Sequence, residues 1–179
     1  MAHTITVHDK QFSVVISESQ IQDAIKRIAG QITQDFSGKT PLFLCVLNGA
    51  FMFAADLLKH FPKSCEVSFV KLASYQGQHS TGKIKELIGL NESLQDRFVV
   101  VIEDIVDTGH TMFMIKNKLK ELGAADVKII SLLTKPEALE VDILVDYVAF
   151  QIPKDFVVGY GLDYDGLGRN FPAIYKIVQ

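Results

Sequence analysis

The sequence predicts an α/β fold in which a parallel-sheet core is covered by helices on both faces. Three segments are almost continuously apolar, as expected of strands buried on both sides: "LFLCVL" at residues 42–47, "RFVVVI" at 97–102 and "VKIISLL" at 127–133. Helical patterns separate them, which is the order of a βαβ protein. The chain has 179 residues, of which 48% are apolar, enough for one domain with a sizeable core. We therefore predict a single domain over residues 1–179.

The amino-terminal half predicts a strand, a helix, a second strand and a second helix. "FSVVI" at residues 12–16 is strand-like, and Ser17 with Gln20 predicts a capping box for the helix that follows. Gly38 ends this helix, whose apolar face comprises Ile21, Ile25, Ile28, Ile32 and Phe36. After the strand at 42–47, Asn48 and Gly49 predict a turn, and "AFMFAADLLKHF" predicts a helix that stops at Pro62.

The carboxyl-terminal half continues the alternation. Residues 66–75 predict a strand, and residues 76–91, rich in polar and turn-forming residues, form a candidate lid. Residues 111–122 predict a helix that is capped by Gly123. "DYVAFQI" at 146–152 and "FVVGYGLDY" at 156–164 are strand-like. We expect the first and last segments to be additions at the edge of the sheet.

Composition disfavours two classes of partner. The 18 basic and 21 acidic residues give a net charge of −3 and form no long block, so a dedicated nucleic-acid binder is disfavoured. Neither a signal-peptide core nor a membrane-length apolar run is found, which favours a soluble, cytoplasmic protein without a membrane partner. Cys45 and Cys65 have no metal-site spacing and are expected to be reduced core thiols.

Three acids lie around one strand-to-helix loop, in the stretch "VVVIEDIVDTGHTM" at residues 99–112. Ligands of open parallel sheets bind beyond the carboxyl ends of the strands, where Glu103 and Asp104 lead into the loop 107–111. The "DTGHT" loop offers hydroxyl groups, a glycine and the N–H groups of a helix N-terminus, which together suit a phosphate monoester. A simpler interpretation is that Asp107 or Thr108 only caps the helix. Together, the acids and the loop indicate a phosphorylated sugar with a divalent cation nearby.

This stretch resembles the phosphoribosyl-diphosphate signature of the type I phosphoribosyltransferases, and more closely that of the hypoxanthine-guanine phosphoribosyltransferases. Four further segments resemble the family in the same order: "VLNGAFMFAADLL", "LASYQGQHSTGKIK", "SLLTKP" and "YVAFQIPKDFVVGYGLDY". The resemblance runs from about Phe12 to the C-terminus. It implies the type I fold with a small hood from the terminal segments, and an enzyme of purine salvage that is a dimer or tetramer.

The resemblance implies transfer of the 5-phosphoribosyl group from 5-phosphoribosyl diphosphate to N9 of hypoxanthine, and of guanine, with Mg²⁺ as cofactor. Glu103 and Asp104 would hold the ribose hydroxyls and the metal, and Asp107 would be the general base. A free aspartate with a pKa near ~3.9 is a weak base, so we expect burial of Asp107 to help. The resemblance also implies that the 5-phosphate is held by the loop Asp107, Thr108, Gly109, His110 and Thr111. Pyrophosphate would be bound by the turn Asn48-Gly49 and by Arg169, and the lid would contribute Ser74 and Tyr75. The base would be read by Lys135, stacked on by Tyr147 and contacted by the Val148 backbone.

Two departures from the family pattern stand out. The family commonly has Lys-Gly in the pyrophosphate turn, often with a cis bond between them, where this chain has Asn48-Gly49. The family commonly has Asp directly after the proline of the pocket strand, as a metal ligand, where this chain has Lys154 and then Asp155. Strand alternation would turn Asp155 away from the metal and present Lys154, unless a local bulge restores Asp155 to the ligand position.

Three other functions stay open at this point. The first is a phosphoribosyltransferase that prefers xanthine. Xanthine and guanine differ from hypoxanthine only at C2, and no side chain in the sequence decides between these bases. RNA-binding regulators share the same fold, but they require a clustered basic face that the dispersed lysines do not suggest. A protein-binding module with a relict site would have lost its acids, which are intact here.

Overall fold

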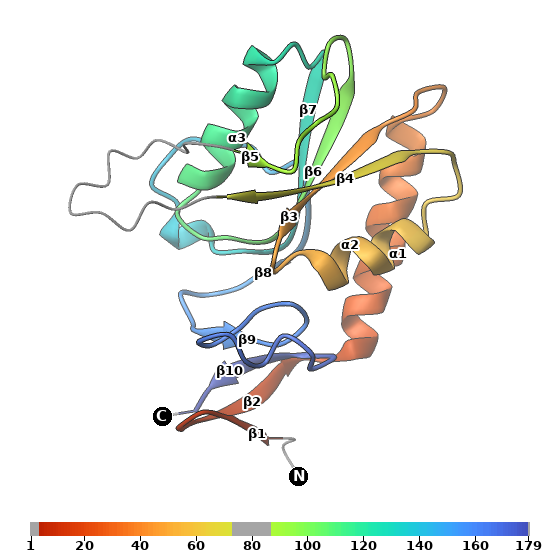
Figure 1. Ribbon diagram of the computed structural model, residues 1–179. Coiled ribbons are helices and arrows are strands. Elements are labelled where there is room, and N and C mark those ends of the chain that lie inside the picture. The colour runs from red at the N-terminus through yellow and green to blue at the C-terminus, as the bar shows by residue number, and fades with distance from the viewer. Residues whose placement is uncertain (1–3, 73–86, 179) are drawn as a thin grey trace, which may run out of the picture.

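The computed structural model describes residues 4–72 and 87–178. A six-stranded sheet forms the centre, in the order β5-β4-β3-β6-β7-β8 (Figure 1). Its strands are β3 (Leu42–Leu47), β4 (Glu66–Leu72), β5 (Leu87–Ile88), β6 (Phe98–Val106), β7 (Asp126–Thr134) and β8 (Tyr147–Gln151). All neighbouring pairs are parallel except β4 with β5, which is antiparallel. The predicted parallel core is confirmed.

Helices cover both faces of this sheet (Figure 1). α1 (Glu18–Asp35) and α2 (Phe51–Lys59) pack on one face, and α3 (His110–Glu121) packs on the other. The predicted apolar stripe of α1 is buried against strand residues such as Phe43 and Ile102. Because successive strand residues face opposite sides, their neighbours Leu44 and Val101 contact the α3 side. The capping box of Ser17 and Gln20 also forms.

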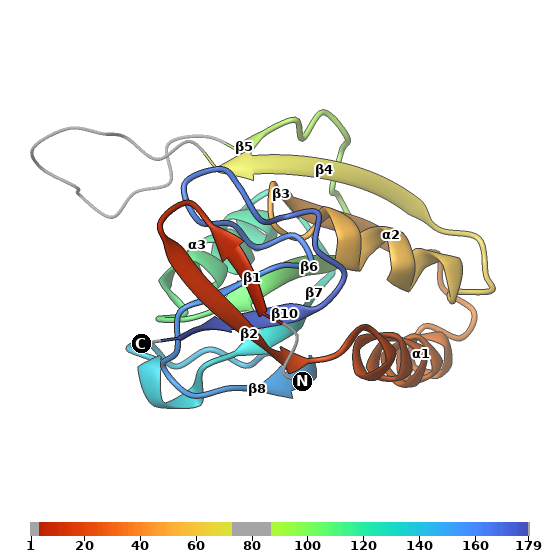
Figure 2. The same cartoon turned by 90° about the horizontal axis from the view of Figure 1, so that it is seen from below.

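The terminal segments form a second sheet, which confirms the hood that the resemblance implies; the expectation that they extend the edge of the main sheet is wrong. This hood is antiparallel, in the order β1-β2-β10-β9. Figure 1 labels all four strands, and Figure 2 shows β1, β2 and β10 from below. Its strands are β1 (Thr4–Val7), β2 (Lys10–Ile16), β9 (Val157–Val158) and β10 (Ile174–Ile177). The hood has a buried cluster of its own around Phe12 and Tyr175, and its residues Ile16 and Ile174 also share a buried cluster with residues of α1, α2 and the main sheet.

Candidate active site

Three chain segments converge at the carboxyl edge of the parallel sheet. They are the turn after β3, the loop between β6 and α3, and the segment after β7 that begins with Lys135 and the short 3-10 helix η1 (Pro136–Ala138). The parallel register of β3, β6 and β7 brings these three strand ends to one side of the sheet. This is the edge where open α/β sheets bind ligands, as the sequence predicts.

Glu103 and Asp104 lie within β6, which continues to Val106 rather than ending before them. Glu103 is 8% exposed, and its Oε2 atom has no hydrogen-bond partner among the described residues. Burial and the neighbouring Asp104 raise the pKa of Glu103 well above its ordinary value. A buried carboxylate without a partner is costly, so this site suits a cation or a hydroxyl donor from a ligand.

Asp104 is packed against the turn that follows β3. A Cβ atom on Gly49 would lie 1.5 Å from Asp104 Oδ2, so only glycine leaves room for this carboxylate. The Ile105 backbone N–H donates to Asp104 Oδ1 at 2.8 Å. Burial raises the pKa of Asp104, although the N–H donors and the charge of Arg169 oppose this shift. The cis peptide bond lies between Leu47 and Asn48, one bond earlier than the resemblance implies.

The loop between β6 and α3 has the shape expected of a phosphate cradle. Gly109 has a φ of 86° and directly precedes the first residue of α3, His110. The first N–H groups of a helix lack partners within the helix and attract anions. The Glu140 N–H donates to the Thr108 carbonyl at 3.0 Å, and Glu140 Oε2 lies 3.1 Å from His110 Nε2. Glu140, in the segment after η1, therefore holds the loop between β6 and α3 through its backbone and its side chain.

Asp107 and Lys135 form an ion pair, with 2.9 Å between Oδ2 and Nζ. The Asp107 side chain is 51% exposed, whereas that of Lys135 is 12% exposed. The expectation that burial would strengthen Asp107 as a base is therefore wrong, because the carboxylate stands at the surface. What the structure provides is a lysine beside the proposed base.

Asp163 is a site residue that the sequence interpretation missed. Its carboxylate pairs with Arg169 at 2.6 Å, and both charges act on the pKa of Asp104. Arg169 also donates to the Gly161 carbonyl at 2.6 Å. The predicted Arg169 is thus brought to the site, together with an unpredicted acid six residues before it. The only sequence signal was the acid-rich turn "GLDYDGLGRN" around it.

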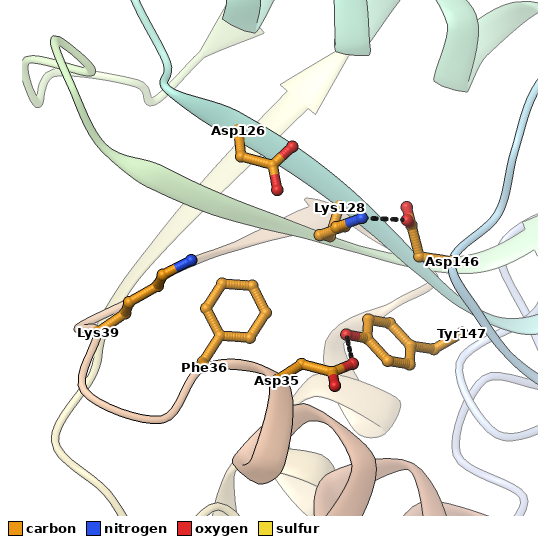
Figure 3. A pocket seen from close by; sticks show the side chains of 7 residues that line it. All are labelled: Asp35, Phe36, Lys39, Asp126, Lys128, Asp146 and Tyr147. Carbon is orange, nitrogen blue, oxygen red and sulfur yellow. Dashed lines mark hydrogen bonds and ion pairs between the residues drawn. The ribbon is translucent and has the colours of Figure 1, made fainter.

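Tyr147 and Val148 do not lie where the stacking prediction requires, and we correct it. β8 starts at Tyr147, which pairs with Ile130 of the parallel neighbour β7. Lys135 follows Ile130 by five residues, so Tyr147 lies about 16 Å from Lys135 along the strand direction. The Tyr147 hydroxyl donates to Asp35 at 2.5 Å, in a cavity of about 340 Å³ at the amino edge of the sheet (Figure 3). The Val148 carbonyl accepts from Arg27 of α1.

Asp155 is likewise not placed with the acids of β6. Its carboxylate pairs with Lys176 Nζ in β10 at 2.9 Å. The Asp155 N–H bonds to the Pro153 carbonyl at 2.7 Å, which makes a tight bend, so strand alternation does not apply here. Lys154 is exposed. The predicted lid at 76–91 falls mostly outside the described residues, and Ser74 and Tyr75 lie outside them entirely.

A parallel sheet with the buried Glu103 and the partly buried Asp104 beside a phosphate cradle is the arrangement of an α/β protein that binds a phosphorylated ligand. Residues 17–165 match the model of the phosphoribosyl transferase domain family, and the chain belongs to this family.

Several relatives that match nine tenths of the chain are named hypoxanthine-guanine phosphoribosyltransferase. The chain is 41% identical over 162 residues to a hypoxanthine-guanine phosphoribosyltransferase of Streptococcus thermophilus, a match covering 90% of each chain. A crystal structure of a hypoxanthine-guanine phosphoribosyltransferase from Bacillus anthracis is similar with a TM-score of 0.86 and 37% identity, covering 97% of this chain and 100% of that one. A hypoxanthine phosphoribosyltransferase of Trypanosoma cruzi gives a TM-score of 0.88 at 30% identity, covering 97% and 95%.

Within residues 4–72 and 87–178, no three His, Cys, Asp or Glu side chains cluster closely enough to hold a metal ion by themselves. No helix in the same ranges is long and apolar enough to cross a bilayer.

Proposed function

We propose that this chain transfers the 5-phosphoribosyl group from 5-phosphoribosyl diphosphate to N9 of hypoxanthine and guanine, yielding IMP or GMP and pyrophosphate. The observation that carries the proposal is the acid pair Glu103 and Asp104 directly before a phosphate cradle at one sheet edge. Relatives named for this activity, similar over nine tenths of the chain, support the same substrates.

The loop 107–111 would hold the 5-phosphate, with the α3 N-terminus supplying partial positive charge. Glu103 and Asp104 would accept hydrogen bonds from the ribose hydroxyls and stabilise positive charge that develops on the ring. Gly49 would allow the diphosphate to approach the backbone closely, with Arg169 neutralising its charge. Each of these groups then acts on a different part of one substrate, which fixes its orientation.

The purine base would bind at the Asp107 and Lys135 pair. Lys135 would donate to the exocyclic oxygen of a 6-oxopurine, which selects against the amino group of adenine. Asp107 would take the ring proton as the bond to N9 forms. The ion pair with Lys135 would hold the Asp107 carboxylate close to the proton that it must accept.

Phe156 replaces Tyr147 as the aromatic residue that we propose to stack on the base. The Ile152 N–H bonds to the Thr134 carbonyl at 2.9 Å, so the chain that leads to Phe156 departs from beside Lys135. The Phe156 ring is 46% exposed and is supported by the rings of Phe12 and Tyr164. A half-exposed ring that is held from behind can offer a face to a ligand.

The acids of this site fit magnesium. Mg²⁺ is commonly bound by one or two carboxylates together with substrate phosphates and water, so it needs no closed protein cage. The partnerless Glu103 Oε2 and the neighbouring Asp104 would hold it, with Asp163 in support, whereas Asp155 is withdrawn from this role. When bound, the ion would neutralise charge on the diphosphate.

Product identification tests this proposal. Purified protein is incubated with 5-phosphoribosyl diphosphate, magnesium and one free base, and nucleotides are separated by chromatography. We expect IMP from hypoxanthine and GMP from guanine, and no product after magnesium is chelated. A xanthine arm addresses the base preference, which depends on the C2 substituent. Absence of any nucleotide with all of these bases would contradict the proposal.

We also propose a homo-oligomer in the cytoplasm. Apolar side chains on α2 and β4 are more than a third exposed, namely Phe51, Val67 and Phe69, and they offer surface for self-association. Light scattering coupled to size-exclusion chromatography would test the assembly, and cell fractionation would test the location.

A further inference from the structure

Residues 159–162 form a tight turn beside the pyrophosphate turn Asn48-Gly49. Gly159 and Leu162 exchange two backbone hydrogen bonds, each of 3.0 Å. The two central residues, Tyr160 and Gly161, have φ values of 47° and 100°, the pattern of a type I′ turn. A Cβ atom on Gly161 would lie 1.9 Å from the Gly49 carbonyl oxygen. The tip of this turn therefore contacts the backbone of the pyrophosphate turn.

The Tyr160 side chain runs from this tip to α2. It is 2% exposed, and its hydroxyl donates to Asp56 Oδ2 at 2.6 Å. The same carboxylate accepts from Gln22 of α1 and from Lys59 of α2, each at 2.9 Å. Asp56 thus joins both helices of one sheet face to the turn 159–162.

A left-handed backbone is uncommon for a residue as large as tyrosine and persists where the surroundings fix it. Here the Tyr160 N–H donates to the Phe171 carbonyl at 2.7 Å, and the Gly161 N–H donates to the Arg169 carbonyl at 2.9 Å. The turn is therefore fixed at its backbone by the carbonyl groups of Arg169 and Phe171, and at its side chain by Asp56.

Gly49 lies between two groups that leave no space around it. Its Cα faces Asp104 Oδ2 on one side, and its carbonyl oxygen touches Gly161 on the other. α2 begins at Phe51, two residues later. A shift of the turn 159–162 relative to α2 must therefore move Gly49, and through it the backbone that borders Asp104.

We propose that Tyr160 is a positioning residue for the diphosphate end of the site, acting through its hydrogen bond to Asp56 on the backbone of Gly49. This inference rests on the proposed function, because it takes the turn Asn48-Gly49 as the place where the diphosphate binds. Tyr160 itself is buried, so we expect it to act without touching the ligand.

The chain provides a matched control for this proposal in Tyr147. Tyr147 is also buried, at 8% exposed, and its hydroxyl also donates to an aspartate at 2.5 Å, but it lies at the opposite edge of the sheet. Tyr160→Phe and Tyr147→Phe therefore remove the same kind of bond, one beside the site and one far from it. We would measure melting temperature, the Kd of magnesium pyrophosphate by calorimetry, and the KM values for both substrates.

We expect both variants to melt at lower temperature than the wild type, and only Tyr160→Phe to bind pyrophosphate about tenfold more weakly. Its KM for 5-phosphoribosyl diphosphate should rise similarly, while the KM for hypoxanthine changes less than twofold. Asp56→Asn should show the same selective loss, and it carries the test if Tyr160→Phe does not fold.

Equal pyrophosphate affinity in Tyr160→Phe and Tyr147→Phe would overturn the proposal and leave Tyr160 a purely structural role. A wild-type protein that does not bind magnesium pyrophosphate would also overturn it. A wild-type protein that binds pyrophosphate but does not convert hypoxanthine would refute the proposed function alone, because the binding comparison of the variants still decides the role of Tyr160.

Discussion

Replacing Gly49 by alanine should displace Asp104 without straining the backbone. The new Cβ would lie 1.5 Å from Asp104 Oδ2, about 1.9 Å short of the 3.4 Å at which ordinary contact begins. The nearest atoms belong to this one side chain, so Asp104 must rotate away by a comparable distance. A misplacement of about 1 Å at a catalytic group can lower activity roughly 10²-fold. We therefore expect kcat/KM to fall at least roughly 10²-fold, which corresponds to about 2.7 kcal/mol.

The assay is initial-rate pyrophosphate release with hypoxanthine, with Gly30→Ala as the matched control. Gly30 lies exposed in α1, and a Cβ there meets nothing within 4 Å. Gly30→Ala should keep wild-type kcat/KM and raise the unfolding free energy by about 0.5–1 kcal/mol through helix propensity. A Gly49→Ala protein that folds and stays within threefold of wild-type kcat/KM would refute the assignment of Asp104 to substrate or metal.

Three further predictions follow from the same geometry. Asp107→Asn should keep the wild-type unfolding free energy, because this side chain is half exposed. Its kcat should fall roughly 10²-fold. An unchanged kcat at saturating substrate would show that Asp107 takes no part in the chemistry. Glu103→Gln should raise the unfolding free energy of the ligand-free protein by about 1 kcal/mol, because it removes a buried carboxylate without a partner, and a thermal shift in the opposite direction would contradict this reasoning. Burial raises the pKa of Asp56, but hydrogen bonds from Tyr160, Lys59 and Gln22 outweigh it and lower this pKa below its ordinary 3.8. The ionised Asp56 therefore stabilises the fold above pH 3.8, and this stabilisation is lost as the pH falls through the pKa of the folded state. The stability gap between wild type and Tyr160→Phe should therefore be larger at pH 7 than in strong acid, and denaturant titrations with equal gaps would show that the bond does not depend on the charge of Asp56.

The parts of the fold that local patterns determine were predicted well. The capping box at Ser17 and the apolar strand 42–47 depend on neighbouring residues only, and both are found as predicted. The acids Glu103 and Asp104 were located by their place at the end of an apolar run in a βαβ order, which the parallel register of β6 preserves. Such features are visible in sequence because their physical cause is short-range.

Most of the errors concern contacts between segments far apart in the chain. Tyr147 lies in the expected strand, but the register of β8 on β7, which decides the edge that it faces, is set by tertiary packing. Asp155 and Asp163 both follow the pocket strand, where the family resemblance predicts a metal ligand. Only the bend after Pro153 shows that Asp155 faces Lys176 of β10 instead of the acids of β6. The contact of Gly161 with Gly49 spans over one hundred residues and leaves no local pattern.

Discrimination between hypoxanthine and adenine is the most direct test of whether this site recognises 6-oxopurines. The measurement is kcat/KM for hypoxanthine and for adenine with saturating 5-phosphoribosyl diphosphate and magnesium, in the wild type and in Lys135→Ala. We expect a preference for hypoxanthine of at least roughly 10³-fold in the wild type, and a smaller preference in Lys135→Ala, which can no longer donate to the exocyclic oxygen. Equal turnover of the two bases, or a preference for adenine, would contradict the assignment of this site to 6-oxopurines.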